Sequence, residues 1–181
     1  MKFRDLTKDE IECRVQSVKE KELVLLLYKD ARVDMNVLDE TVGAENWQRE
    51  HYECKGNLFC RVGIDVTGND NWVWKSDCGV ESNTEAQKGE ASDSFKRACF
   101  NWGIGRELYT SPVVKIPADK CKIVDSGAKD RYGKPVYKCY DKFSVEKIRI
   151  ENKRITALAI RNDSTGRRAY VWTEETEEKG E

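Results

Sequence analysis

Residues 88–109 read KGEASDSFKRACFNWGIGRELY, and this stretch decides the fold of the chain around it. Small and apolar residues recur in it with the spacing of one helix face, at Ala91, Phe95, Ala98, Cys99 and Trp102. Gly103 follows, and glycine commonly ends helices. We therefore expect the longest helix of the chain over residues 84–102, with this apolar stripe packed against a sheet.

Three strand candidates precede this helix, at residues 47–54, 57–67 and 71–81. The middle one alternates apolar with polar or small residues, which is the pattern of a half-buried strand. The short connections contain Gly56 and Gly68 and are typical of hairpin turns. The three segments therefore predict an antiparallel meander.

The first 45 residues predict two helices and one strand. Thr7 and Glu10 have the spacing of a capping box, so a short helix is expected from there to about Val15. The apolar run 22–28 predicts a strand, and residues 31–42 predict a second helix that Gly43 ends.

Beyond residue 110 the chain changes character. Turn-forming residues there separate short strand candidates, at residues 120–124, 136–140, 143–151, 154–161 and 168–172. The expected fold class is α+β, with an antiparallel β-meander packed against a long helix in a β-β-β-α core and a small C-terminal β appendage. The expected domains are a core of residues 1–110 that binds DNA and oligomerises, a basic β-rich extension of residues 111–172, and a disordered acidic tail of residues 173–181.

The near-neutral net charge of −1 hides a strong asymmetry along the 181 residues. Residues 1–110 carry 16 basic and 21 acidic side chains, residues 111–172 carry 15 and 7, and residues 173–181 carry 1 and 5. A basic segment indicates a polyanionic partner, and an acidic tail can compete for the same surface. An ordinary solvated surface is the alternative that charge alone does not exclude.

Several classes of protein are not indicated. The N-terminus has no apolar signal-peptide segment, and the longest apolar run is too short to span a bilayer. The seven cysteines include no C-x-x-C pair, and His51 is the single histidine, so we expect reduced core thiols and no metal site. Cys121 and Cys139 flank an expected hairpin and can meet in space. The chain is expected to be soluble and cytoplasmic, with no membrane partner.

Adjacent cations on the long helix are the candidate binding residues. Lys96 and Arg97 can contact successive phosphates of a nucleic acid lying along the helix, with Lys88 earlier in the same helix and Arg106 just past its end. The spacing alone favours a simpler interpretation, in which these cations solvate the helix and pair with Glu90 or Asp93.

The stretch 88–109 resembles the signature helix of the Rad52 family of single-strand annealing proteins, in which a similar helix carries Lys-Arg-Ala followed by an aromatic residue and glycine. Three further segments resemble the family in the same order: residues 6–15, residues 31–38, and residues 43–47 with Trp47. The resemblance covers about residues 5–110. Two positions depart from the family pattern, since Phe100 stands where an arginine is frequent and Ala44 where an aromatic residue is frequent.

By position, this resemblance implies DNA contacts from Arg32, Lys88, Lys96 and Arg97. It also implies homo-oligomeric rings or arcs in which single-stranded DNA is held by its backbone while its bases stay available for pairing. Annealing of complementary strands in homologous recombination and DNA repair then needs no catalytic residue, metal or cofactor, and the sequence has no phosphate-binding loop. A single-strand-binding protein or a nuclease is a further expected partner, and the compact size favours a bacterial or phage version of the family.

Two other functions stay open. A coating protein that binds single strands without annealing them needs the same basic groove, and a structural protein-interaction module with an incidental basic face fits the composition.

The aromatic residues have several possible roles. Trp47 and Trp102 are expected in the core. Trp72 and Trp74 share one strand face, and for them a place in the core or in a subunit contact is favoured over base stacking. The glutamates at 174, 175, 177 and 178 are expected to shield the groove or to recruit a partner.

Overall fold

The computed structural model describes residues 1–80 and 86–174, and the side chains of residues 86–88 lie outside the described part. The chain forms two compact units and passes between them after Leu6, Lys29 and Arg106. Residues 1–6 and 30–106 make the first unit, and the remaining residues make the second. The α+β class is confirmed, since helices occur beside sheets whose described strand pairs are all antiparallel.

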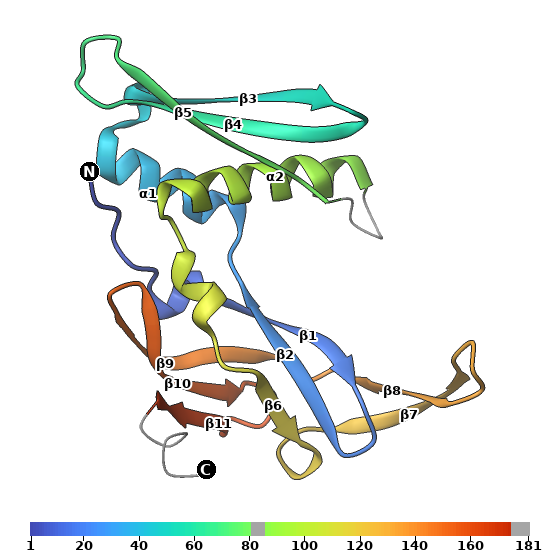
Figure 1. Ribbon diagram of the computed structural model, residues 1–181. Coiled ribbons are helices and arrows are strands. Elements are labelled where there is room, and N and C mark those ends of the chain that lie inside the picture. The colour runs from blue at the N-terminus through green and yellow to red at the C-terminus, as the bar shows by residue number, and fades with distance from the viewer. Residues whose placement is uncertain (81–85, 175–181) are drawn as a thin grey trace. The chain divides into compact units, whose positions relative to one another are not determined.

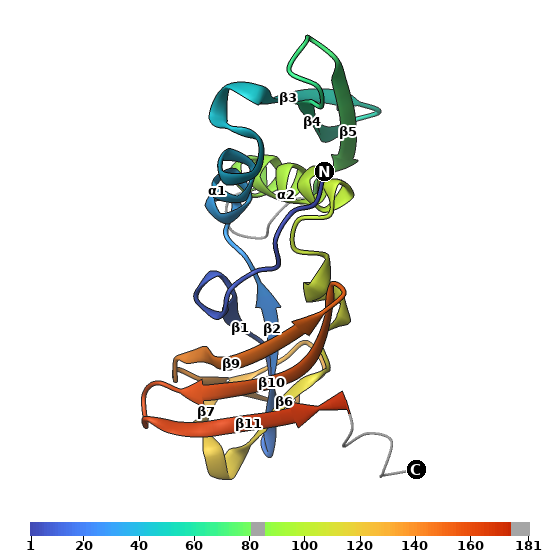
Figure 2. The ribbon, with the colours of Figure 1, turned by 90° about the vertical axis from the view of Figure 1, so that its left-hand side faces the viewer.

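A three-stranded sheet and two helices build the first unit (Figure 1). The strands follow the order β3 (Trp47–Cys54), β4 (Asn57–Asp65) and β5 (Trp72–Cys78). The helices α1 (Ala31–Val42) and α2 (Ala86–Trp102) lie on one face of this sheet, as Figure 2 shows from the side. The expected start of α2 at Thr84 lies outside the described residues.

Local signals explain both ends of α1. The side chain of Asp30 accepts a hydrogen bond from the backbone N–H of Arg32 at 2.8 Å and so caps the first turn. Gly43 ends the helix with φ +86°, a left-handed conformation that glycine adopts without steric cost, and its N–H donates to the carbonyl of Asp39.

The core of the first unit lies between its sheet and its helices. The Trp102 indole N–H donates to the carbonyl of Val62 at 3.0 Å, which fixes the end of α2 against the middle strand. Trp47 stacks on Phe95 with ring centroids 6.1 Å apart. Both tryptophans pack against the core, as expected. The fully buried members of this cluster are Val37, Leu38, Cys60, Val62, Ile64, Phe95, Ala98, Cys99 and Ile104.

A six-stranded antiparallel sheet with the strand order β11-β10-β9-β1-β2-β6 dominates the second unit. Its strands are β1 (Glu12–Val18), β2 (Glu22–Tyr28), β6 (Val114–Pro117), β9 (Phe143–Glu151), β10 (Arg154–Asn162) and β11 (Arg167–Thr173). A separate hairpin is formed by β7 (Ile123–Lys129) and β8 (Pro135–Cys139). One face of the large sheet is apolar and buried, with Leu23, Leu25, Ile116, Val145, Leu158 and Ile160 among its residues.

The helix expected over residues 7–15 is wrong beyond its first turn. The capping box of Thr7 and Glu10 is present, but it starts only the 3-10 turn η1 (Lys8–Glu10). From Glu12 the chain is strand β1, in which Cys13 and Val15 are less exposed than Arg14 and Gln16. Pairing with β2 and β9 decides this segment, because alternating residues suit a strand between two partners.

The expected C-terminal β appendage is also corrected. Apart from the β7–β8 hairpin, the strands after residue 110 do not form a sheet of their own, because β6 pairs with β2, and β9 pairs with β1. The N-terminal hairpin therefore supplies the middle of their sheet. The strand β6 was not expected, and the strand expected at residues 120–124 lies instead at residues 123–129.

No helix in the described part of the chain is both long and apolar enough to span a membrane.

Candidate nucleic-acid interface

The helix α2 carries its two adjacent cations beside its buried stripe. Phe95, Ala98 and Cys99 turn into the core and are fully buried. Lys96 and Arg97 lie between them in sequence and stay partly exposed, since successive helix residues are about 100° apart around the axis. Their cationic groups are therefore held on a rigid element at the surface of the first unit.

Arg97 is oriented by the neighbouring strand β5. Its Nε lies 3.3 Å from Oδ1 of Asp77, and 41% of its side chain is exposed. The second carboxylate oxygen of Asp77 accepts a hydrogen bond from Nδ2 of Asn101 at 3.3 Å. Asp77 and Asn101 thus connect Arg97 to the last turn of α2.

Two more cations converge on the end of α2. The carbonyl of Asn101 accepts hydrogen bonds from Nζ of Lys75 at 3.0 Å and from Nη2 of Arg106 at 2.9 Å. Arg106 also donates through Nε to the carbonyl of Phe100 at 2.9 Å. Carbonyls of the last helical turn carry partial negative charge, which favours cations there. We call Lys75, Lys96, Arg97 and Arg106 the α2 cation cluster.

Lys75 is the cation of this cluster that the sequence did not single out. In β5 it lies opposite the buried Val62 of β4, so it belongs to the sheet face that packs against the helix, where it is half-buried. Its ammonium group lies 4.5 Å from the ring centroid of Trp102. Alternation along β5 places Lys75 and Asp77 on the same face, and a cation on a helix-facing position was the signal that could have revealed it.

Two other predicted contacts do not join the cluster. Arg32 lies in the first turn of α1 with 84% of its side chain exposed, 4.0 Å from the carboxylate of Asp30. No contact among the described residues connects Arg32 to the cations of α2. Lys88 belongs to α2, but its side chain lies outside the described part of the chain.

Trp72 and Trp74 lie on the sheet face that is turned away from α2. Trp74 is one residue from Lys75, which faces the helix, so the two side chains point to opposite sides of the strand. The two indole rings are 6.3 Å apart, and the guanidinium of Arg61 lies 4.5 Å from the Trp74 ring. This excludes the pair from the core beneath the helices and leaves a subunit contact or base stacking.

A comparison with known protein families identifies the family of the chain. A model of the Rad52/22 family of double-strand break repair proteins matches residues 3–121. The chain belongs to the Rad52/22 family. No curated protein and no solved structure matches the chain. Family membership gives this protein a role in DNA repair and recombination.

The family match covers the whole α2 cation cluster and ends before β7. At Phe100, which replaces a frequent arginine of the Rad52 pattern, the guanidinium of Arg106 lies 5.8 Å from the aromatic ring. A positive charge is therefore retained beside this position. The strands β7 to β11 lie outside the segment that the family model matches.

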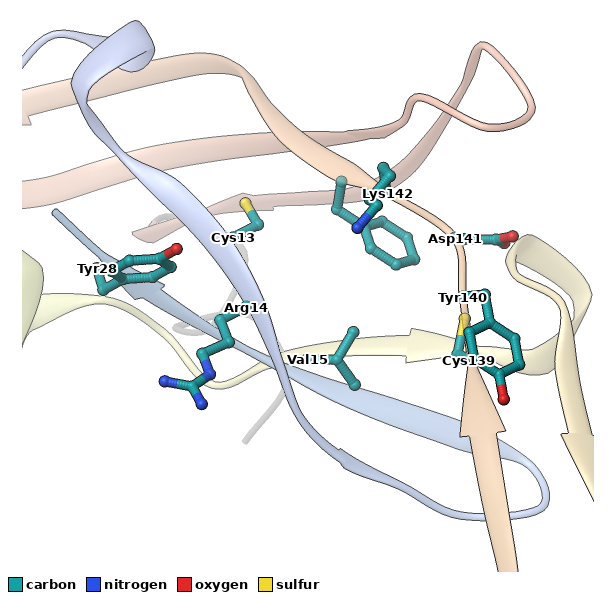
Figure 3. A pocket seen from close by; sticks show the side chains of 9 residues that line it. Cys13, Arg14, Val15, Tyr28, Cys139, Tyr140, Asp141 and Lys142 are labelled. Carbon is teal, nitrogen blue, oxygen red and sulfur yellow. The ribbon is translucent and has the colours of Figure 1, made fainter. Parts of the chain in front are cut away.

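A cavity of about 420 Å³ lies in the second unit, lined by β1 and by the segment that joins β8 to β9 (Figure 3). Arg14, Lys142 and Tyr140 line it together with Asp141. The carboxylate of Asp141 accepts hydrogen bonds from the Lys122 backbone at 2.9 Å and from the Asn162 side chain at 2.8 Å. Asp141 therefore serves to hold the connections of this unit together.

The described residues contain no group of three or more His, Cys, Asp or Glu side chains placed to hold a metal ion. The thiol of Cys121 donates to the carbonyl of Pro117 at 3.4 Å, and burial followed by the neighbouring Cys139 raises the pKa of Cys121 to about 12.

Proposed function

We propose that this Rad52/22 family protein binds single-stranded DNA through the α2 cation cluster, assembles into homo-oligomeric rings or arcs, and anneals complementary strands without nucleotide hydrolysis. The observation that carries this proposal is the network that holds Arg97, Lys75 and Arg106 on Asp77 and the last turn of α2. This network lies within the family match.

The chemistry of the cluster suits the phosphate backbone rather than the bases. Lysine and arginine cations neutralise phosphates and release counterions, and such contacts read no sequence. A guanidinium has five N–H donors in a planar fork, so binding to a carboxylate is compatible with binding to a phosphate oxygen. Asp77 and Asn101 fix the position of Arg97 before DNA arrives, which lowers the entropy cost of binding.

Backbone binding leaves the Watson–Crick edges available. Two strands held on cationic surfaces repel each other less, and base pairing then supplies the free energy of annealing. The protein contributes positioning and charge neutralisation, and no covalent step is required. Repetition of the cluster around an oligomer would provide a continuous track longer than one chain offers.

Mixing complementary fluorescently labelled strands tests the proposal. The protein should accelerate pairing above the spontaneous rate, and electron microscopy should show rings or arcs with and without a single strand. Slower pairing would indicate a coating protein. Protein that stays monomeric at every concentration, with DNA present or absent, would refute the proposed mechanism.

A further inference from the structure

The outer face of β9, β10 and β11 is strongly cationic. Arg161 of β10 lies directly opposite Arg168 of β11, and Lys147 and Arg149 of β9 lie opposite two alanines of β10. All four cations are exposed. We call these four residues the β9–β11 basic face.

Hydrogen bonds hold two of the three arginines of this face, Arg168 and Arg149, in place. Arg168 donates to both carboxylate oxygens of Glu146, through Nε at 2.6 Å and Nη2 at 2.7 Å. Arg149 donates through Nε to the hydroxyl of Thr156 at 3.0 Å. The guanidinium positions are therefore set before any ligand binds, which reduces the ordering cost of binding.

The face carries more positive charge than its carboxylates neutralise. Glu146 has its pKa lowered mainly by its hydrogen bond to Arg168, with Lys147 and Arg161 contributing. Arg149 lies 3.5 Å from a carboxylate oxygen of Glu151 and Arg161 lies 3.9 Å from one of Asp163, so three carboxylates stand against the four cations. Lys147 makes no ion pair with a described residue. Like charges directly opposite in a sheet destabilise it, so the Arg161–Arg168 pair favours an added anion.

The residues between the cations distinguish two kinds of nucleic acid. The centre of the face holds Ala157 and Ala159, opposite Arg149 and Lys147, and the exposed Val171 of β11 lies opposite Ala159. The aromatic side chains of β11, Tyr170 and Trp172, are paired with Ile160 and Leu158, which belong to the buried face. Single-strand binding surfaces usually combine cations with rings that stack on bases. A sheet face that presents cations between aliphatic side chains suits a duplex bound by its phosphates.

We propose that the β9–β11 basic face binds the phosphate backbone of double-stranded DNA. The inference rests on the proposed function in one respect, since a duplex is the product of annealing. The face lies outside residues 3–121 and is a different surface from the α2 cation cluster. The charge of residues 111–172, with 15 basic and 7 acidic side chains, is consistent with this polyanionic partner.

The test uses the full chain with Lys147→Gln, Arg149→Gln and Arg161→Gln combined, leaving Arg168 on Glu146. The matched control removes the same charge from the exposed β7–β8 hairpin with Lys129→Gln, Arg131→Gln and Lys134→Gln. Binding of a labelled 20-base-pair duplex and of a labelled oligothymidine is measured between 50 and 200 mM salt. Thermal melting of each variant verifies its fold.

We expect the face variant to bind the duplex about tenfold or more weakly, with a salt slope reduced by about 2.7 for three lost contacts at about 0.9 each. Oligothymidine binding should stay within about twofold of the wild type. Unchanged duplex binding, or an equal loss in the hairpin control, would overturn the inference. An equal loss of duplex and oligothymidine binding would overturn the assignment to a duplex.

The two proposals fail in different ways. If Lys96→Ala with Arg97→Ala leaves oligothymidine binding intact while the face variant loses the duplex, the function proposed for α2 fails and the β9–β11 basic face stands. If the first variant loses oligothymidine and the face variant keeps the duplex, the reverse holds.

Discussion

The double substitution Lys96→Ala and Arg97→Ala gives the sharpest test of the α2 cation cluster. Alanine has the highest helix propensity, so α2 should remain intact. Arg97 is partly exposed, and its loss removes a surface ion pair worth about 0.2–1 kcal/mol, while Asp77 still accepts a hydrogen bond from Asn101. A large loss of DNA affinity would therefore not reflect unfolding.

The magnitude follows from the number of cations. Four phosphate contacts per subunit predict a slope of about −2.8 in log affinity against log salt for a single strand, and two contacts predict about −1.4. Between 50 and 200 mM salt the wild-type protein should then lose about 50-fold in affinity and the variant about sevenfold. Fluorescence anisotropy with labelled oligothymidine measures both slopes.

Lys129→Ala with Arg131→Ala serves as the control, because it removes the same charge from the exposed turn between β7 and β8. Its slope should match that of the wild-type protein. A Lys96→Ala, Arg97→Ala protein that is folded and keeps the wild-type affinity and slope would refute the role of α2 in DNA binding.

Three further predictions concern packing, the tail and the cysteines. Gly79→Ala should lower the unfolding free energy by about 1–3 kcal/mol, because the added Cβ would lie 2.2 Å from the carbonyl oxygen of Glu90. Urea titration measures this loss, and an unchanged unfolding midpoint would contradict the close packing of Gly79 on α2. Deletion of residues 175–181, which hold four glutamates and one lysine, should tighten or speed DNA binding if the tail competes for a basic surface; unaltered binding would leave it as a solubilising end. Burial raises the pKa of both Cys13 and Cys121 from 9.0 to about 12, so these thiols lose protons in the unfolded chain first. The two thiols should therefore leave the unfolding free energy unchanged below pH 9 and lower it as the pH rises from 9 to 12. A Cys13→Ala, Cys121→Ala variant should show a shallower fall over this pH range, and an equal fall would contradict the assignment to these thiols.

Local patterns determined much of the first unit. The helix at residues 31–42 matches its prediction, because Asp30 and Gly43 supply both ends locally. The apolar stripe of α2 is buried as expected, since its residues alone define one helix face. The strand range 47–54 is likewise as predicted, because turn residues are local signals, and the range 22–28 in the second unit follows from its apolar run.

The candidate site was predicted only in part. The resemblance to the Rad52 family pointed to Lys96 and Arg97 as DNA contacts, but it did not reveal the partners that orient Arg97. Asp77 and Lys75 come from a strand distant in sequence, and register alone places them beside Asn101. The contributions of Arg32 and Lys88 to DNA binding remain predictions.

Tertiary structure decided how the strands of the second unit pair. The sequence of residues 7–15 holds a true helix-start signal, yet β1 forms because β2 and β9 offer hydrogen-bond partners on both sides. In the same way, β6 and β9 to β11 complete their sheet with a hairpin from the N-terminal third of the chain. The spacing of apolar residues and the capping of helices depend on residues close in sequence, so both can be recognised from the sequence alone. Strand pairing joins residues more than a hundred positions apart, so its outcome depends on which backbone groups and apolar faces meet in the folded protein.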